Sequence, residues 1–166
     1  MSYCIRQATA TDCSELAAIE RAAAAMFLET PHPQLSAAPL ACEHLQPADM
    51  IWVVLDAQQC PVGFAIARRA GCALHLQEID IYPRHARRGL GARLIEAIAD
   101  WARAHGLAAL TLSTCDDVPW NAPYYARLGF RTLDVTKLTA ELLAIRQAET
   151  MAGLPMEHRV CMQRAL

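Results

Sequence analysis

The chain has 166 residues, of which 54% are hydrophobic and 19% are charged, and its formal net charge at pH 7 is -2. This length suits one domain around one hydrophobic core, and the composition excludes a disordered chain. The 15 basic residues are scattered along the sequence. We therefore expect no cationic surface of the kind that binds a nucleic-acid backbone, and no nucleic-acid partner.

Long apolar segments are missing from the sequence. The stretch from Met1 to Arg6 lacks the apolar run of a signal peptide, and nowhere do 18 apolar residues follow one another. The seven cysteines show neither a Cys-x-x-Cys pair nor a Cys/His spacing typical of metal ligands. We predict a cytoplasmic protein without membrane contact, with reduced and mostly buried thiols and no metal.

The first half of the chain predicts a strand, a helix, a loop and three further strands. Residues 3–7 form the first strand, and Asp12 is placed to cap a helix whose apolar residues recur at helical spacing up to Phe27. Three prolines between Glu29 and Pro39 predict a loop, which often lines a site. Residues 50–55 and 62–68 predict a hairpin, and 73–82 a third strand that ends before Pro83.

The second half predicts strands that alternate with helices. An amphipathic helix over 90–105 ends at Gly106, and Asn121 is placed to cap a short helix that runs to Leu128. The other expected elements are strands over 108–114, 130–135 and 159–163 and a helix over 139–152. Together these elements predict a single α/β domain over residues 1–166, with a mixed, partly antiparallel and partly parallel central sheet flanked by helices.

The segment IDIYPRHARRGLGARL, residues 79–94, places a strand, a turn, two glycines and an amphipathic helix in succession. Free amides at a helix start bind anions, and Gly89 and Gly91 let a phosphate approach the main chain. An ordinary tight turn is the alternative. A dinucleotide-binding fingerprint fails at Leu94, where it requires a small residue, and a Walker loop fails because Ala92 follows Gly91.

This succession of strand, proline, Gly-x-Gly and helix resembles the GNAT superfamily of N-acetyltransferases, in which the loop holds the pyrophosphate of coenzyme A. Ala86 stands where the family motif begins with Gln or Arg, which weakens the match but not the argument from main-chain amides. The resemblance implies a GNAT-like acyl-CoA N-acyltransferase fold. It also implies cofactor contacts along the strand and the loop, at Ile79, Asp80, Ile81, Arg87, Arg88, Gly89, Leu90, Gly91 and Ala92.

A second segment, from Val118 to Phe130, resembles the GNAT segment that ends in Tyr-x-x-x-Gly-Phe. The resemblance implies that Asn121 and Tyr125 contact the cofactor and that Tyr125 protonates the departing thiolate. A core tyrosine with its hydroxyl satisfied at the edge is the alternative for Tyr125. Together with the strand order, the two motifs extend the resemblance over residues 3–135.

Acetyl transfer to an alkylamine requires a base, because such an amine, with a pKa of about 10, is mostly protonated at pH 7. The resemblance implies a base on strand 73–82, where His75 and Glu78 are the candidates. Strict alternation puts these two on opposite faces unless a bulge intervenes, so both stay open, with Glu78 favoured. A main-chain N–H near Ile81 is the expected oxyanion donor.

We therefore predict an enzyme that transfers an acetyl group from acetyl-CoA directly to a primary amine of a small molecule, an amino acid or a peptide, without a metal. Phe27, Glu29 and Trp120 are the expected substrate-binding residues, and the helix over 139–152 could support a homodimer. Two alternatives stay open. One is a non-catalytic module that senses acetyl-CoA, and the other is a nucleotide-phosphate binder of another fold.

Overall fold

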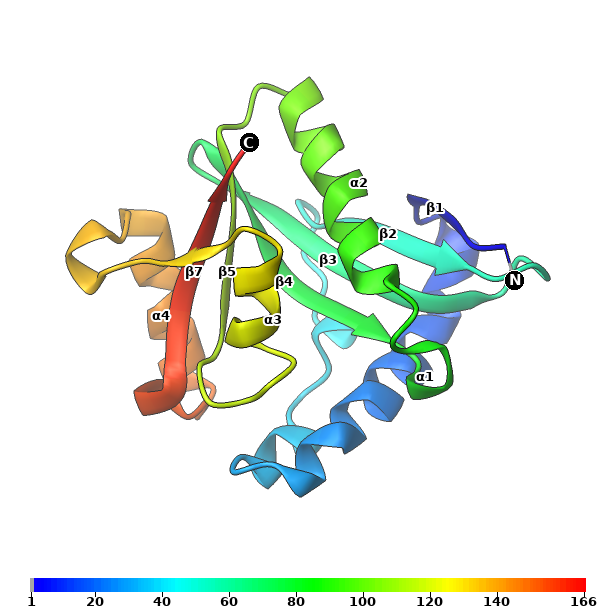
Figure 1. The fold of residues 1–166 in the computed structure, drawn as a ribbon, viewed down its shortest axis with the longest axis horizontal. Coiled ribbons are helices and arrows are strands. Elements are labelled where there is room, and N and C mark those ends of the chain that lie inside the picture. The colour runs from blue at the N-terminus through cyan, green and yellow to red at the C-terminus, as the bar shows by residue number, and fades with distance from the viewer. Residues whose placement is uncertain (1) are drawn as a thin grey trace.

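The computed structural model describes residues 2–166, so the domain predicted over 1–166 begins one residue outside this range. It contains a seven-stranded sheet in the order β1-β2-β3-β4-β5-β7-β6 (Figure 1). The β4–β5 pair is parallel and the other pairs are antiparallel, which confirms the predicted mixed sheet. The strands are β1 (Cys4–Gln7), β2 (Met50–Leu55), β3 (Pro61–Ala70), β4 (Ala73–Ile81), β5 (Ala109–Cys115), β6 (Arg131–Thr132) and β7 (Arg159–Ala165).

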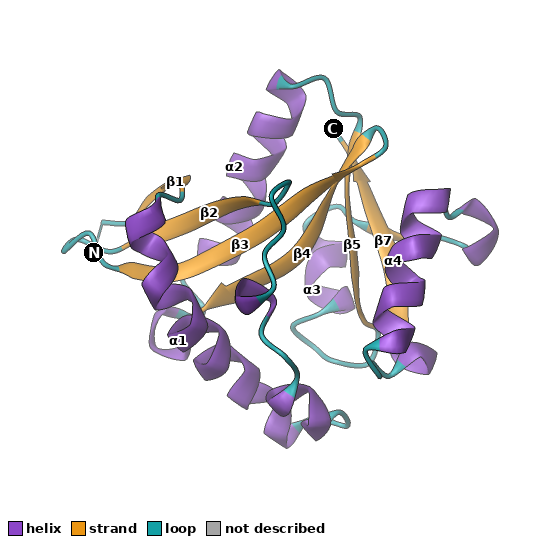
Figure 2. Cartoon of the chain, turned by 180° about the vertical axis from the view of Figure 1, so that it is seen from behind, coloured by secondary structure: helices purple, strands orange, loops and turns teal. Residues whose placement is uncertain are grey.

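Helices cover both faces of this sheet. The helices are α1 (Cys13–Ala24), α2 (Leu90–Ala104), α3 (Ala122–Arg127) and α4 (Ala140–Met151). Helices α2 and α3 lie on the face seen in Figure 1, and α1 and α4 lie on the opposite face, seen in Figure 2. Short 3-10 helices over Ala25–Glu29, Pro33–Ala37 and Ala41–Glu43 connect α1 to β2. Within residues 2–166, no helix is both long and apolar enough to cross a bilayer.

Two apolar clusters hold the layers together. The stripe predicted for 90–105 is buried along α2 and packs on inward-facing residues of β4 and β5, and a smaller cluster fills the space between α1 and the sheet. The first includes Leu90, Leu94, Ile95, Ile98, Leu74, Leu76, Leu110 and Leu112, and the second Leu16, Ile19, Phe64 and Ile66. The spacing of apolar residues along each of these helices therefore determines which face of the helix packs on the sheet.

Several local predictions were wrong. Asp12 does not cap α1, because its carboxylate accepts a hydrogen bond from the Thr9 amide at 2.7 Å and pairs with Arg6. Asn121 makes no side-chain cap on α3. The strand expected over 130–135 shrinks to β6 and does not pair with β5, because β7 lies between them. Only two of the seven thiols, those of Cys115 and Cys161, are buried.

Strands β4 and β5 are hydrogen-bonded to each other over only their first halves. Pairing runs only from Ala73 beside Ala109 to Leu76 beside Leu112. Beyond these residues β4 continues to Ile81 and β5 to Cys115, and the two strands diverge in Figure 1. The divergence leaves one edge of β4 without a strand partner over its second half.

A β-bulge lies where this divergence begins. Ile66 of β3 pairs with Glu78 whereas the next residue pairs with Leu76, so Gln77 is an extra residue in β4. Leu76 and Ile79 consequently both pack into the cluster under α2 although they are three residues apart. The bulge therefore places His75 and Glu78 on the same face of the sheet, the condition under which both could point toward one site.

The cluster under α1 generates a stability prediction. Phe64 is fully buried at the centre of the sheet, so Phe64→Ala should lower the free energy of unfolding by about 3–5 kcal/mol through lost burial and a residual cavity. Chemical denaturation followed by circular dichroism measures this difference. Leu143→Ala, on an exposed part of α4, should change it by less than about 0.5 kcal/mol, and equal effects would contradict the assignment of this core.

Candidate active site

The loop between β4 and α2 has the geometry of an anion site. Arg87 and Gly89 adopt positive φ angles of 59° and 72°, and α2 begins at the next residue, Leu90. The first helical bond runs from the Arg93 amide to the Gly89 carbonyl, at 3.1 Å. Within the described part of the chain, the amides of Arg87, Gly89, Leu90, Gly91 and Ala92 have no hydrogen-bond acceptor. These amides lie where the helix dipole is positive, an arrangement that favours a phosphate.

The arginines beside this loop divide into two roles. Arg88 donates to the Tyr3 hydroxyl at 2.9 Å and to the Arg84 carbonyl at 3.3 Å, and Arg93 donates to the Tyr3 carbonyl at 3.0 Å. Both therefore fasten the loop to the start of the chain. The exposed Arg87 guanidinium pairs with no described residue and borders a cavity of about 290 Å³. Arg87 is thus the side chain placed to add charge to the amide site.

The two glycines of the loop have different reasons to be glycine. A Cβ at Gly89 would meet no atom within 4 Å, but its left-handed backbone is strained for other residues. A Cβ at Gly91 would lie 2.8 Å from the Tyr124 hydroxyl. Gly91 therefore lets α3 approach the start of α2, which brings the second sequence motif against the first.

Main-chain amides of β4 point into the gap between β4 and β5. The Tyr82 amide donates to the Val62 carbonyl of β3 at 2.9 Å. Because successive residues of a strand direct their amides to opposite edges, the Ile81 and Ile79 amides face the unpaired edge. The Ile79 amide lies 3.3 Å from a Glu78 carboxylate oxygen. The gap thus offers polar main-chain groups to an extended ligand.

Three carboxylates converge beside this gap. Glu78 and Asp80 of β4 and Glu20 of α1 have oxygen atoms within 4.8 Å of one another. Burial, and next the charge of Glu20, raise the pKa of Glu78 to about 7. Burial, and next the charges of Glu78 and Glu20, raise the pKa of Asp80 well above its ordinary value. A Glu78 carboxyl with a pKa near 7 can therefore both hold and release a proton at neutral pH.

Glu20 was missed by the sequence analysis. It is 5% exposed, and its carboxylate accepts hydrogen bonds from the Ala41 and Cys42 amides, the latter at 3.0 Å. A signal was available, because Glu20 follows Leu16 by four residues and so lies on the apolar face of its helix. A charge in that position requires polar partners, which here are two amides of the connecting segment.

His75 is placed differently from Glu78. Its side chain is 4% exposed, and its Nδ1 lies 3.0 Å from the Thr111 hydroxyl of β5. Burial lowers the pKa of His75 to about 4, so the imidazole is neutral at pH 7. The bulge brings His75 to the face of Glu78, but its ring is held by β5 at the point where the two strands still pair.

Tyr125 lies in α3, and its ring packs edge-on against Phe130 with centroids 5.8 Å apart. Burial, and next the charge of Glu78, raise the pKa of Tyr125, so the phenol stays protonated. Its hydroxyl makes no hydrogen bond with any described residue. In residues 2–166, the one side-chain nitrogen or oxygen that is both buried and without a hydrogen-bond partner is Arg159 Nε, so the Tyr125 hydroxyl must be reached by solvent. The hydroxyl is therefore available to a ligand.

The predicted substrate-binding residues come from two segments that the fold brings together. The rings of Phe27 and Trp120 contact each other edge-on with centroids 6.1 Å apart. Glu29 is exposed at the end of the same 3-10 helix as Phe27, and Asn121 is half-buried at the start of α3. The loop after α1 and the loop after β5 therefore form one wall beside the gap.

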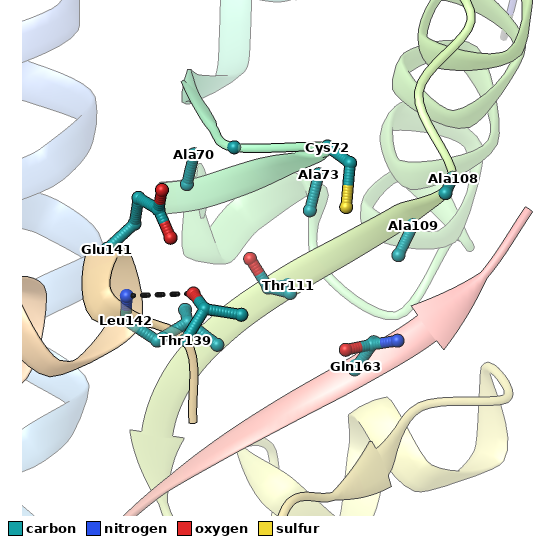
Figure 3. Close-up of a pocket in the computed structure, with 11 residues that line it drawn as sticks. Ala70, Cys72, Ala73, Ala108, Ala109, Thr111, Thr139, Glu141, Leu142 and Gln163 are labelled. Atoms are coloured by element: carbon teal, nitrogen blue, oxygen red, sulfur yellow. Dashed lines mark hydrogen bonds between the residues drawn. The ribbon is translucent and has the colours of Figure 1, made fainter. Parts of the chain in front are cut away.

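A second cavity, of about 290 Å³, lies near the opposite end of β4. Figure 3 shows the starts of β4 and β5 on one side of it and the first turn of α4 on the other, where the Thr139 hydroxyl accepts from the Leu142 amide at 3.4 Å. Most of its lining residues are small, four of the eleven being alanine, and Glu141 is its one charged residue. It is distinct from the loop and the gap described above.

A mixed sheet whose adjacent parallel strands diverge beside an anion-binding helix start is the architecture of the acyl-CoA-dependent N-acyltransferases. The chain matches the acetyltransferase (GNAT) family over residues 4–130 and belongs to that family. The resemblance seen in the sequence is thereby confirmed, together with the predicted class of enzyme.

Solved structures share the fold over the whole chain. A GNAT-family acetyltransferase from Staphylococcus aureus Mu50 is 16% identical with a TM-score of 0.73, and the match covers 99% of each chain. A PaiA N-acetyltransferase from Thermoplasma acidophilum, in complex with coenzyme A, is 13% identical with a TM-score of 0.72 over 100% of each chain. An N-acetylglutamate synthase from Neisseria gonorrhoeae, complexed with coenzyme A and N-acetyl-glutamate, is 19% identical with a TM-score of 0.73 over 100% of this chain and 35% of that one.

Helix α2 provides a matched test of the loop. Gly89 and Gly106 lie at its two ends, with φ angles of 72° and 69°, and a Cβ at either would meet no atom within 4 Å. Gly89→Ala and Gly106→Ala should therefore lose similar stability, about 1–2 kcal/mol each. Only Gly89→Ala should weaken coenzyme A binding in calorimetry, by about tenfold or more, or about 1.4 kcal/mol. Equal affinities for the two variants would contradict the assignment of the loop.

Proposed function

We propose that the protein transfers the acetyl group of acetyl-CoA directly to a primary amine of a small molecule, an amino acid or a peptide. The observation that carries this proposal is the pairing of a carboxylate and a phenol, Glu78 and Tyr125, beside the gap between β4 and β5. The two side chains lie close enough that the charge of Glu78, after burial, raises the pKa of Tyr125. The coenzyme A complexes among the fold relatives support the choice of co-substrate.

The loop and the gap suggest how acetyl-CoA lies. Its diphosphate would accept hydrogen bonds from the amides around Leu90, with Arg87 adding charge. Its pantetheine arm would run along the unpaired edge of β4 and hydrogen-bond the Ile79 and Ile81 main chain, as a neighbouring strand does. In this pose the thioester lies between Glu78 and Tyr125.

Glu78 is our choice of base. An ammonium acceptor must lose a proton before it attacks, and a carboxyl with a pKa near 7 can accept that proton at neutral pH. His75 remains the second candidate, but its ring bonds Thr111, and its pKa of about 4 makes it a weaker base. The proton would reach Glu78 directly or through one water.

The reaction then proceeds in two steps. The neutral amine attacks the thioester carbonyl, a C–N bond forms, and the Ile81 amide donates a hydrogen bond to the oxyanion. The intermediate collapses as the C–S bond breaks, and the thiolate takes the proton of the Tyr125 phenol. The proton that the amine nitrogen loses restores the phenol through water, so charge and atoms balance and no metal enters any step.

The charge of the site favours a cationic acceptor. Glu20, Glu78 and Asp80 offer carboxyl oxygens that an ammonium group can hydrogen-bond, and the half-buried ring of Phe27 and the exposed ring of Trp120 border the same wall. An ammonium group attached to an apolar or aromatic body would match both features.

The predicted cytoplasmic location and the predicted homodimer stay predictions.

Tyr125→Phe isolates the proposed acid. The substitution removes only the hydroxyl, so kcat should fall by about 100-fold while the dissociation constant for coenzyme A stays nearly unchanged. A thiol-release assay over a panel of primary amines, with calorimetry alongside, measures both. Tyr124→Phe, the neighbouring phenol, should retain most of kcat. Unchanged kcat in Tyr125→Phe would remove this residue from the mechanism.

Glu78→Gln isolates the proposed base through pH. Below about pH 7 the Glu78 carboxyl is protonated and cannot accept a proton from the amine. The kcat/KM of the wild type should therefore rise with pH as Glu78 loses its proton near pH 7. Dividing the wild-type profile by that of Glu78→Gln cancels the titration of the amine substrate. The ratio should increase about tenfold per pH unit up to that point and then level off. A ratio independent of pH would exclude Glu78 as the base.

A further inference from the structure

Three segments far apart in the sequence meet beyond the ends of β5 and β7. His32 comes from the loop after α1, Asp116 and Asp117 directly follow β5, and His158 directly precedes β7. Cys115, the last residue of β5, lies beside them. None of these residues has a part in the acetyl transfer described above.

The distances within this group suit metal coordination. His32 Nε2 lies 2.8 Å and 2.9 Å from the two Asp117 carboxylate oxygens. His158 Nδ1 lies 3.6 Å from Asp117 Oδ2 and 3.5 Å from Asp116 Oδ1. Ligand atoms around a tetrahedral zinc ion are separated by about 3.3–3.8 Å, given bonds of about 2.0–2.3 Å. The rings of His32 and His158 have centroids 5.2 Å apart, so a rotation of the His158 side chain toward His32 would let the group surround one ion.

Asp117 is the residue that joins the group. His32, Cys115 and Asp117 offer donor atoms that all lie within 4.8 Å of one another, and so do Asp116, Asp117 and His158. One carboxylate thus faces two imidazoles and a thiol. A hydrogen-bonded His–Asp pair would account for His32 and Asp117, but it gives no role to a second imidazole and a buried thiol around the same carboxylate.

The burial of the group gives it an inner and an outer side. The side chain of His32 is 5% exposed and Cys115 is fully buried, whereas Asp117 and His158 are 28% and 44% exposed at the side chain. An ion could therefore enter from solvent and be held by the buried donors. Imidazole, thiolate and carboxylate together suit zinc or cobalt rather than calcium or magnesium.

We propose that His32, Cys115, Asp117 and His158 bind a divalent transition metal such as Zn²⁺. The Cys115 thiol loses its proton to solvent when it binds the ion. The ion would fasten the loop after α1 to the end of β5 and the start of β7, and so add to the contact between Phe27 and Trp120, which joins the loops after α1 and β5. Its role is structural, and the site does not depend on the proposed acetyl transfer.

The full chain, purified without a polyhistidine tag and stripped with a chelator, provides the test. After equilibration with Zn²⁺ and removal of excess, elemental analysis should find about one zinc per chain. Co²⁺ in place of zinc should give the visible absorption of a four-coordinate site and a near-ultraviolet thiolate charge-transfer band. Cys115→Ser should lose that band, whereas Cys161→Ser, which changes the other buried thiol, should keep it.

Two substitutions address the carboxylate and an imidazole. Asp117→Asn and His32→Gln should lose the bound zinc and the rise in melting temperature that zinc gives the wild type, whereas His44→Gln, at an exposed histidine, should keep both. Circular dichroism shows whether each variant is folded. If a variant does not fold, the wild-type cobalt spectrum decides. Wild-type protein without stoichiometric zinc, a cobalt complex without the thiolate band, or zinc retained by a folded Asp117→Asn would each overturn the proposal.

Discussion

The candidate active site depends on the separation of β4 from β5 beyond the middle of each strand. Parallel strands normally pair along their length, yet here the ladder stops after Leu76 and Leu112 while both strands continue. Unpaired amides inside a protein need partners, so the free edge of β4 calls for a ligand that can hydrogen-bond like a strand. The bulge at Gln77 lies at the same point and turns Glu78 toward α1. The same irregular region of the sheet thus opens the gap between β4 and β5 and positions the Glu78 carboxylate beside it.

The electrostatics of the site follow from that arrangement. On one side, amides at the start of α2 and the cation of Arg87 provide positive potential for a diphosphate. On the other, burial, and next the charges of the neighbouring carboxylates, raise the pKa of Glu78 to about 7 and that of Asp80 well above its ordinary value. In the pose that we propose, acetyl-CoA would place its diphosphate at the positive end and its thioester beside the carboxyl groups.

Much of this architecture could be predicted from the sequence, because it depends on local periodicity. The bounds of β2 match residues 50–55, and the loop at Gly89 and Gly91 has the predicted place before α2. The helix caps expected at Asp12 and Asn121 failed for local reasons, whereas the other failures depend on contacts between distant residues. The bulge at Gln77 reflects the pairing of β3 with β4, and the insertion of β7 beside β5 could not be seen in the local pattern of either strand. The cluster around Asp117 escaped notice because its donors are spread over more than 120 residues.

Cofactor binding, as proposed, depends most directly on the hydrogen bonds between the amide loop and a diphosphate. Calorimetry with two ligands, coenzyme A and pantetheine, tests this dependence, because pantetheine keeps the thiol arm and lacks the diphosphate. If the loop supplies most of the binding energy, coenzyme A should bind with measurable heat and pantetheine should bind far more weakly, by about 100-fold or more. Equal affinity for the two ligands, or no heat with coenzyme A, would contradict the account.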